Sequence, residues 1–228
     1  MGQGRARGLA VDEQGVVRCW WGASTPDYSR YHDREWGFPV VDDRRLFEKI
    51  CLEGFQSGLS WLTVLRKRPA FRRAFDGFAF RKVARYGSRR TTILLSDAAI
   101  IRHRGKIESV VNNAGRALEL VKEFGSLAAY FWRFEPPPAA RPQRLTRRAL
   151  LKLTAPPEAV ALSRDLKRRG WTYVGPTTVY AFMQAMGLVN DHLEGCYVRG
   201  PVEKARKALR RPVRYSRGTK WSAAEFMQ

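Results

Sequence analysis

The chain has 228 residues, of which 44 % are hydrophobic, so it can form one substantial folded domain and is not wholly disordered. Lys and Arg number 42 against 21 Asp and Glu, which gives a formal net charge of +21. This excess favours a polyanionic partner, because each phosphate that Lys or Arg neutralises releases condensed counterions. A compositional bias toward arginine would also make the chain basic, but we expect the partner to be a nucleic acid.

The cysteine content and the lengths of the apolar runs indicate where in the cell the protein is expected. The three cysteines, Cys19, Cys51 and Cys196, do not make a disulfide framework. No apolar run reaches the length of a membrane span, and residues 1–18 lack the apolar middle of a signal peptide. We therefore expect a cytoplasmic monomer with no membrane partner.

Composition divides the chain into three parts. Residues 1–16 are rich in Gly and Arg and are expected to form a flexible basic arm. Residues 17–198 carry the regular patterns and are interpreted as one domain. Residues 199–228 form a basic tail, in which we expect a short helix around 202–210 and otherwise loose chain.

Helical patterns fill the first half of the domain. Asp42 and Asp43 are suitable N-caps for a helix with a regular apolar face. Gly54 and Gly58 are expected to interrupt this helix. A second helix then starts near Trp61 and is expected to stop at Pro69.

The second half gives the clearest helical pattern, an amphipathic stripe over residues 103–123. Further helices are predicted over residues 127–134, 158–169 and 177–186. We find no run of alternating strand pattern with hairpin turns. The sequence therefore predicts an all-α fold.

The last two predicted helices flank a tight connection around Gly175. A helix that starts after such a hairpin presents backbone N–H groups to a phosphate. We assign Gly175 and Thr177 to DNA binding on this basis. A plain helical corner would produce the same pattern.

The stretch from Cys19 to Trp61 is unlike ordinary core sequence, because Trp and Tyr crowd it and their polar atoms need partners when buried. It also contains two potential metal ligands, Cys19 and His32, and a carboxylate, Glu53, followed by glycine. We interpret it as a base-sized aromatic pocket that Glu53 faces, with Cys19 and His32 at its rim.

Taken together, these features resemble the 3-methyladenine DNA glycosylase I family, bacterial base-excision enzymes of the helix-hairpin-helix superfamily. The matching segments follow the family's order over roughly residues 17–197, and they are Tyr31–Gly37 (YHDREWG), Leu52–Gly54 (LEG) with Gly58–Trp61 (GLSW), Ile100–Ile107 (IIRHRGKI) and Gly187–His192 (GLVNDH). They are specific together, although none is specific alone. The resemblance implies an all-α helix-hairpin-helix glycosylase fold. It also implies hydrolysis of the N-glycosidic bond of 3-methyladenine in double-stranded DNA.

The resemblance further implies a zinc ion that ties the N- and C-terminal segments together. Four residues match the family's zinc positions: Cys19, His32, His192 and Cys196. The last two stand at i and i+4, so one helical turn can present both to one ion. Two thiolates and two imidazoles leave no open position for water, so we expect one structural Zn²⁺ per chain. Cys51 fits an apolar helix face, and His103 fits the surface or a phosphate contact.

Four aromatic residues match the family's base-pocket positions: Trp21, Tyr28, Tyr31 and Trp61. They are assigned to stacking on an extruded base, with ordinary core packing as the alternative for each, and Trp36 is assigned to the core. Methylation at N3 gives adenine a positive charge, which aromatic faces attract and which already weakens the glycosidic bond. Glu53 matches the family's base-contacting glutamate and is assigned as the catalytic residue. Phe55 departs from the family pattern, in which a smaller or polar residue is more usual, and the sequence does not determine its effect on the pocket wall.

The hairpin over residues 174–178 has no lysine that could form a Schiff base with the sugar, so we expect a monofunctional enzyme that leaves an abasic site. Asp191 is left out of the catalytic set, because the family is not thought to use it there. The main alternative is a zinc-stabilised protein that binds damaged DNA without catalysis. Glu53 and the pocket aromatics favour the enzyme. An RNA-binding module would need exposed aromatics on a sheet, which the sequence does not show.

Overall fold

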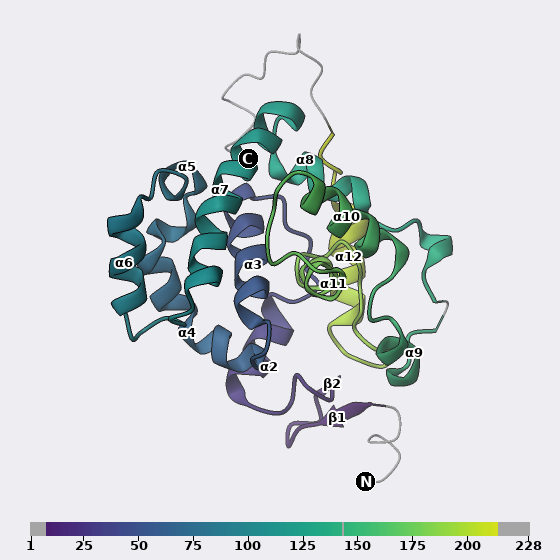
Figure 1. Cartoon of the computed structure of the whole chain (residues 1–228). Helices are drawn as coiled ribbons and strands as arrows, with labels where there is room; N and C mark the ends of the chain where they lie inside the picture. The colour runs from purple at the N-terminus through teal and green to yellow at the C-terminus, as the bar shows by residue number, and fades with distance from the viewer. Residues whose placement is uncertain (1–7, 143, 214–228) are drawn as a thin grey trace, which may run out of the picture.

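The computed structural model describes residues 8–142 and 144–213, and in this part of the chain the architecture is mostly helical (Figure 1). The chain begins with β1 (Leu9–Val11), β2 (Val17–Cys19), α2 (Pro26–Arg34), α3 (Asp43–Gln56), α4 (Trp61–Ala74), η1 (Asp76–Phe78), α5 (Phe80–Val83) and α6 (Ser88–Ser96). It continues with α7 (Arg104–Phe124), α8 (Leu127–Phe131), η2 (Trp132–Phe134), η3 (Pro138–Ala140), α9 (Arg147–Lys152), α10 (Pro157–Arg168), α11 (Pro176–Ala185) and α12 (Arg199–Ala208). The all-α prediction is confirmed, with one small β-hairpin added.

Helix α3 is the central element of the fold (Figure 1). It contacts α4, α7, α8 and α11, and every residue from Leu46 to Phe55 is buried. Asp42 caps its start, as predicted, by accepting a hydrogen bond from the backbone N–H of Arg45 at 2.8 Å. The predicted interruption at Gly54 is wrong, because the helix continues to Gln56. Gly54 instead lets the backbone approach a neighbour, since a Cβ there would lie 3.2 Å from that of Tyr173.

Helix α4 differs from the prediction that Pro69 would stop it, because it runs through Pro69 to Ala74. A proline inside a helix costs about 3 kcal/mol. The turn beyond it brings in Phe71 and Phe75, both fully buried. Burying each large apolar side chain contributes about 1.5–3 kcal/mol, so the core offsets the local cost.

A short antiparallel β-hairpin precedes α2, with Leu9 opposite Cys19. Its turn is held by Asp12, whose carboxylate accepts hydrogen bonds from the backbone N–H groups of Gln14 and Val16. This part of the predicted flexible arm is therefore ordered, which corrects the expectation for residues 8–16. Residues 1–7 of that arm lie outside the described residues.

Helices α10 and α11 form the predicted helix-hairpin-helix unit. Gly170 ends α10 with a positive φ of 82°, and Tyr173 adopts a φ of 57° in the connection. The side-chain amide of Asn113, from α7, holds the hairpin by donating to Thr172 O and accepting from Thr172 N, both at 3.0 Å. The hairpin is therefore fixed to α7 as well as to its own helices.

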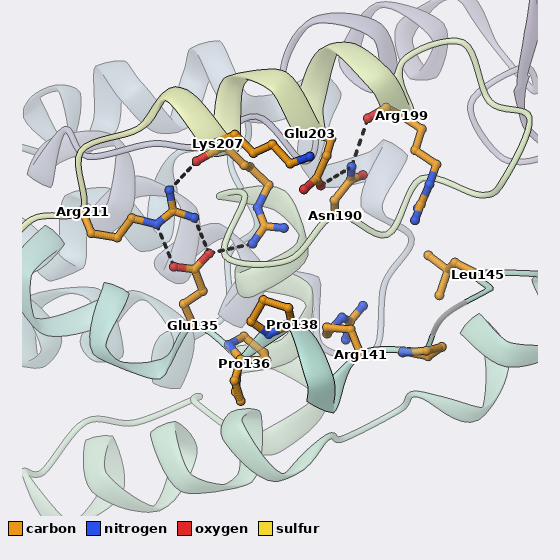
Figure 2. Close-up of a pocket in the computed structure, with 13 residues that line it drawn as sticks. Glu135, Pro136, Pro138, Arg141, Leu145, Asn190, Arg199, Glu203, Lys207 and Arg211 are labelled. Carbon is orange, nitrogen blue, oxygen red and sulfur yellow. Dashed lines mark hydrogen bonds and ion pairs between the residues drawn. The ribbon is translucent and has the colours of Figure 1, made fainter.

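The C-terminal helix α12 packs on the domain through Val202, which is fully buried. Figure 2 shows Arg211 paired with Glu135, and Arg206 binds the same carboxylate at 2.7 Å. The helix predicted around residues 202–210 is thus confirmed, displaced slightly toward the N-terminus. Residues 214–228, where loose chain was expected, lie outside the described residues. No helix in the described part of the chain is long and apolar enough to cross a membrane.

The hairpin gives the first testable prediction. Replacing Asn113 with Ala removes both bonds to Thr172 from a side chain that is only 3 % exposed. Because two partly buried hydrogen bonds that fix the hairpin to α7 are lost, the free energy of unfolding should fall by about 1–3 kcal/mol in urea denaturation. Glu119→Ala, an exposed change on the same helix, is the control and should cost less than about 0.5 kcal/mol. Equal stability of the two variants would show that the hairpin does not depend on Asn113.

Candidate functional site

A cluster of four metal-ligating side chains lies where the two ends of the domain meet. Cys19, His32, His192 and Cys196 are all buried, and their ligand atoms lie within 4.8 Å of one another. Nδ1 of His192 lies 3.2 Å from Nε2 of His32 and 3.6 Å from Sγ of Cys196. These separations match the edges of a tetrahedron with metal–nitrogen bonds of about 2.0 Å and metal–sulfur bonds of about 2.3 Å. The cluster is therefore consistent with a structural metal site.

The surroundings of the cluster fix which ring nitrogens face its centre. Nδ1 of His32 lies 2.8 Å from the carboxylate of Asp33, which is itself paired with Arg18. Nε2 of His192 lies 2.9 Å from the carbonyl oxygen of Trp36. Each imidazole thus donates its outer N–H and keeps its inner nitrogen free to bind a metal, an arrangement typical of metal-ligating histidines. The four predicted ligands are brought together as expected.

The aromatic stretch forms a cavity of about 300 Å³ next to this cluster. Its lining residues are Trp21, Tyr28, Tyr31, Trp36, Lys49, Glu53, Gln56, Trp61, Leu150, Ala181 and Gln184. The structure therefore brings together Glu53 and all four aromatic residues predicted for the pocket. Trp36, assigned to the core, is only 8 % exposed but also contributes to the wall.

Three segments position the rings around the cavity. Tyr28 and Tyr31 lie one helical turn apart on α2, and the hydroxyl of Tyr28 accepts a hydrogen bond from the backbone N–H of Leu62 at 3.1 Å. Trp61 begins α4, and its ring centroid lies 5.4 Å from that of Tyr31. Trp21 packs edge-on against Tyr28, with centroids 5.7 Å apart. The walls of the cavity are therefore held by ring contacts and by helix α2.

Phe55 does not take part in this wall. Its ring lies 4.4 Å from that of Phe71, inside the core, and it is outside the set of lining residues. The sequence left the effect of Phe55 on the pocket wall undetermined, and the structure shows that α3 turns this side chain away from the cavity. Cys51 is also a core residue, as predicted, and His103 is exposed at the N-cap of α7.

Glu53 lies on the buried face of α3 and forms an ion pair with Lys49, one turn earlier, at 2.5 Å. The two residues are 5 % and 6 % exposed. Burial raises the pKa of Glu53 and lowers that of Lys49 to about 8, while the opposite charge of each partner acts against both shifts. Sequence reasoning missed Lys49. The sequence carries little signal for it, because a lysine at i,i+4 from a glutamate is usually an exposed residue.

Gln184 was also missed, because only the fold brings α11 to the cavity. Its amide donates to Asp191 at 2.8 Å, and the same carboxylate accepts from Tyr180 at 2.5 Å and from Arg141. Asp191 is fully buried and is not among the lining residues. Its carboxylate holds α11 and the segment around Arg141 together, which agrees with its exclusion from the catalytic set.

A second cavity, of about 470 Å³, lies between α12 and the proline-rich segment (Figure 2). It contains none of the predicted site residues. Across it, Glu135 binds Arg206 and Arg211, and Asn190 donates a hydrogen bond to Glu203. We therefore interpret it as the seam where α12 packs on the domain.

The hairpin residues predicted to bind DNA are not among the lining residues of the aromatic cavity. Gly175 is the N-cap of α11, and Pro176 occupies its first turn. Thr177 is exposed in the same turn. The backbone N–H groups of this turn have no partners within the helix, as at any helix start, so they are suited to an anion.

Comparison with known proteins identifies the family. The family model described as methyladenine glycosylase matches residues 20–199. The chain belongs to the methyladenine glycosylase family. It is 44 % identical over 182 residues to DNA-3-methyladenine glycosylase 1 of Escherichia coli strain K12, an alignment that covers 79 % of this chain and 96 % of the relative. It is 42 % identical to DNA-3-methyladenine glycosylase of Haemophilus influenzae, covering 79 % of this chain and 97 % of that protein.

Solved structures of methyladenine glycosylases share the fold. A crystal structure of 3-methyladenine DNA glycosylase I is 45 % identical, with a TM-score of 0.72, and covers 79 % of this chain and 98 % of its own. The Staphylococcus aureus enzyme, solved to define its recognition of 3-methyladenine, is 35 % identical with a TM-score of 0.73, covering 80 % and 96 %. The family match includes the whole aromatic cavity together with His32, His192 and Cys196.

Proposed function

We propose that this protein is a DNA glycosylase that extrudes 3-methyladenine from alkylated double-stranded DNA and releases it by hydrolysis of the N-glycosidic bond. The observation that carries the proposal is the placement of a buried carboxylate, Glu53, in an aromatic cavity of about 300 Å³. The relatives named above are glycosylases of this specificity. The net charge of +21 supports a nucleic acid substrate.

The cavity can replace the stacking interactions that a cationic base loses when it leaves the DNA helix. Trp21, Tyr28, Tyr31 and Trp61 provide aromatic faces, each worth on the order of 1–3 kcal/mol per stacked base. The indole Nε1 of Trp61 is buried without a hydrogen-bond partner among the described residues. A bound base could supply the missing acceptor, which would relieve a cost of about 1–3 kcal/mol.

Glu53 is proposed to carry the chemistry by its charge. As a carboxylate it can accept a hydrogen bond from the exocyclic amino group and oppose the positive charge of the methylated ring. Because that charge already weakens the glycosidic bond, no strong general acid is needed to protonate the leaving base. The hairpin over residues 174–178 has no lysine to attack the sugar, so the product is an abasic site in an uncut strand.

The hairpin and the metal cluster are proposed to support this pocket from outside. Gly175 and Thr177 bind a DNA phosphate at the start of α11. Cys19, His32, His192 and Cys196 hold one zinc ion with no open position, so the ion is structural and takes no part in the reaction. It ties Cys19, which ends β2 two residues before Trp21, to the turn that follows α11.

The role of Glu53 can be tested by Glu53→Gln, which keeps the shape and removes the charge. Release of 3-methyladenine from alkylated duplex DNA should fall by at least about 10²-fold, because the buried negative charge that stabilises the cationic base is lost. Binding to undamaged duplex should not change. Free bases can be separated and counted by chromatography.

The matched control is Glu48→Gln, on the same helix. Glu48 is also buried, but it pairs with Arg72 and does not line the cavity. This variant should release the base at the parental rate, after correction for the folded fraction. Parental activity in Glu53→Gln would refute the assignment. Tight binding of damaged DNA by the parent protein, without any base release, would support the non-catalytic alternative.

The metal proposal predicts one zinc ion per chain in protein purified without chelator, as measured by atomic emission. Cys196→Ser should lose the ion and melt at a lower temperature, because one ligand of the closed shell is removed. Cys51→Ala removes a buried thiol outside the cluster and should retain the full zinc content. Parent protein that is free of zinc would contradict the assignment.

A further inference from the structure

The ammonium group of Lys49 occupies a position in the base cavity that a cationic ligand would be expected to use. Its Nζ lies 3.3 Å from the centroid of the Trp61 ring. It also lies 2.5 Å from Oε1 of Glu53 and donates to the hydroxyl of Tyr31 at 2.8 Å. One side chain of the protein thus engages the carboxylate and two of the rings that the proposed function assigns to the substrate.

A charged Lys49 opposes the binding of a charged base for two reasons. It neutralises Glu53 and already takes up the cation–π attraction of Trp61. It also places a positive charge in the wall of a cavity of about 300 Å³, so a cationic base bound there would lie beside a like charge. An uncharged base would meet no such repulsion.

The surroundings of Lys49 allow its charge to be lost without unfolding. Burial lowers the pKa of Lys49 to about 8, against the attraction of Glu53. The other charged groups acting on it come from neighbouring segments: Arg68 of α4 lowers the pKa further, and Glu35, at the end of α2, raises it. Tyr31 faces it as a neutral phenol, because burial raises the pKa of that hydroxyl well above its usual value.

We propose that Lys49 is a charge gate that determines which bases the cavity accepts. In its ammonium form it closes the site formed by Glu53 and Trp61 to a cationic base, and in its amine form it opens that site. Binding of a cationic base is therefore coupled to release of the Lys49 proton to solvent, whereas binding of an uncharged base is not. This inference rests on the proposed glycosylase function.

The gate makes a signed prediction for the pH dependence. Below pH 8 the free protein carries Lys49 mainly as ammonium, so kcat/KM for release of 3-methyladenine should rise with pH, by up to about tenfold per unit, and level off above about pH 8. Lys49→Met keeps the length and removes the charge. It should release the base faster at pH 7 and lose the rise in rate that the parent shows up to about pH 8. Lys49→Arg, which stays charged, should remain slow at every pH.

Two controls separate the gate from a structural role. The first control uses a duplex that carries 3-deaza-3-methyladenine, an uncharged isostere of the lesion. Lys49→Met and Lys49→Arg should still bind this duplex, and the affinity should not change with pH near 8. Lys106→Met removes another buried lysine, which donates to Phe55 O and lies outside the cavity, and should keep the parental pH profile.

The outcomes distinguish this inference from the proposed function. If Lys49→Met and the parent release 3-methyladenine with superimposable pH profiles, the gate is wrong and the glycosylase assignment stands. Loss of binding to the uncharged isostere in both variants would also overturn the gate, because it would show that Lys49 only maintains the cavity. Release of no base by the parent at any pH would refute the proposed function itself.

Discussion

The closed cluster of Cys19, His32, His192 and Cys196 is the constraint on which the rest of the structure depends. It joins residues from the two ends of the domain through atoms that lie within 4.8 Å of one another, in a site that excludes solvent. Trp21 lies two residues after one ligand, Cys19, and Tyr31 directly precedes another, His32. A shift of these ligands would therefore move two walls of the base cavity, so a structural ion at this point would also determine recognition.

The cavity combines apolar surroundings, which favour uncharged groups, with a pair of charged side chains. Its rings and its burial favour uncharged groups, yet α3 places Glu53 and Lys49 there as a pair. Such a pair is costly to bury, and replacing it with apolar side chains often stabilises a protein. Its retention in the wall of the cavity therefore points to a use in binding rather than in folding. The neighbouring carboxylate of Asp191 is fully enclosed by Arg141, Tyr180 and Gln184 and serves the fold.

Much of this site could be predicted from the sequence, because segments that resemble the family identify the metal ligands and the pocket rings by their matching positions. Predictions from local sequence patterns were wrong where contacts with distant segments of the chain determine the structure. Pro69 does not end α4, because the buried rings of Phe71 and Phe75 lie beyond it. The strand Leu9–Val11 is too short to show an alternating pattern. Lys49 resembles an ordinary surface lysine at i,i+4 from a glutamate until the burial of α3 is known, and Gln184 reaches the cavity only through the tertiary fold.

The central claim is that the four-ligand cluster holds the recognition cavity in its active form. The most direct test is to strip the protein of metal and to add zinc stepwise while measuring release of 3-methyladenine from alkylated duplex DNA. The account predicts that base release returns in proportion to bound zinc and is complete at one ion per chain. Metal-free protein that releases 3-methyladenine as fast as the zinc-bound protein would contradict it.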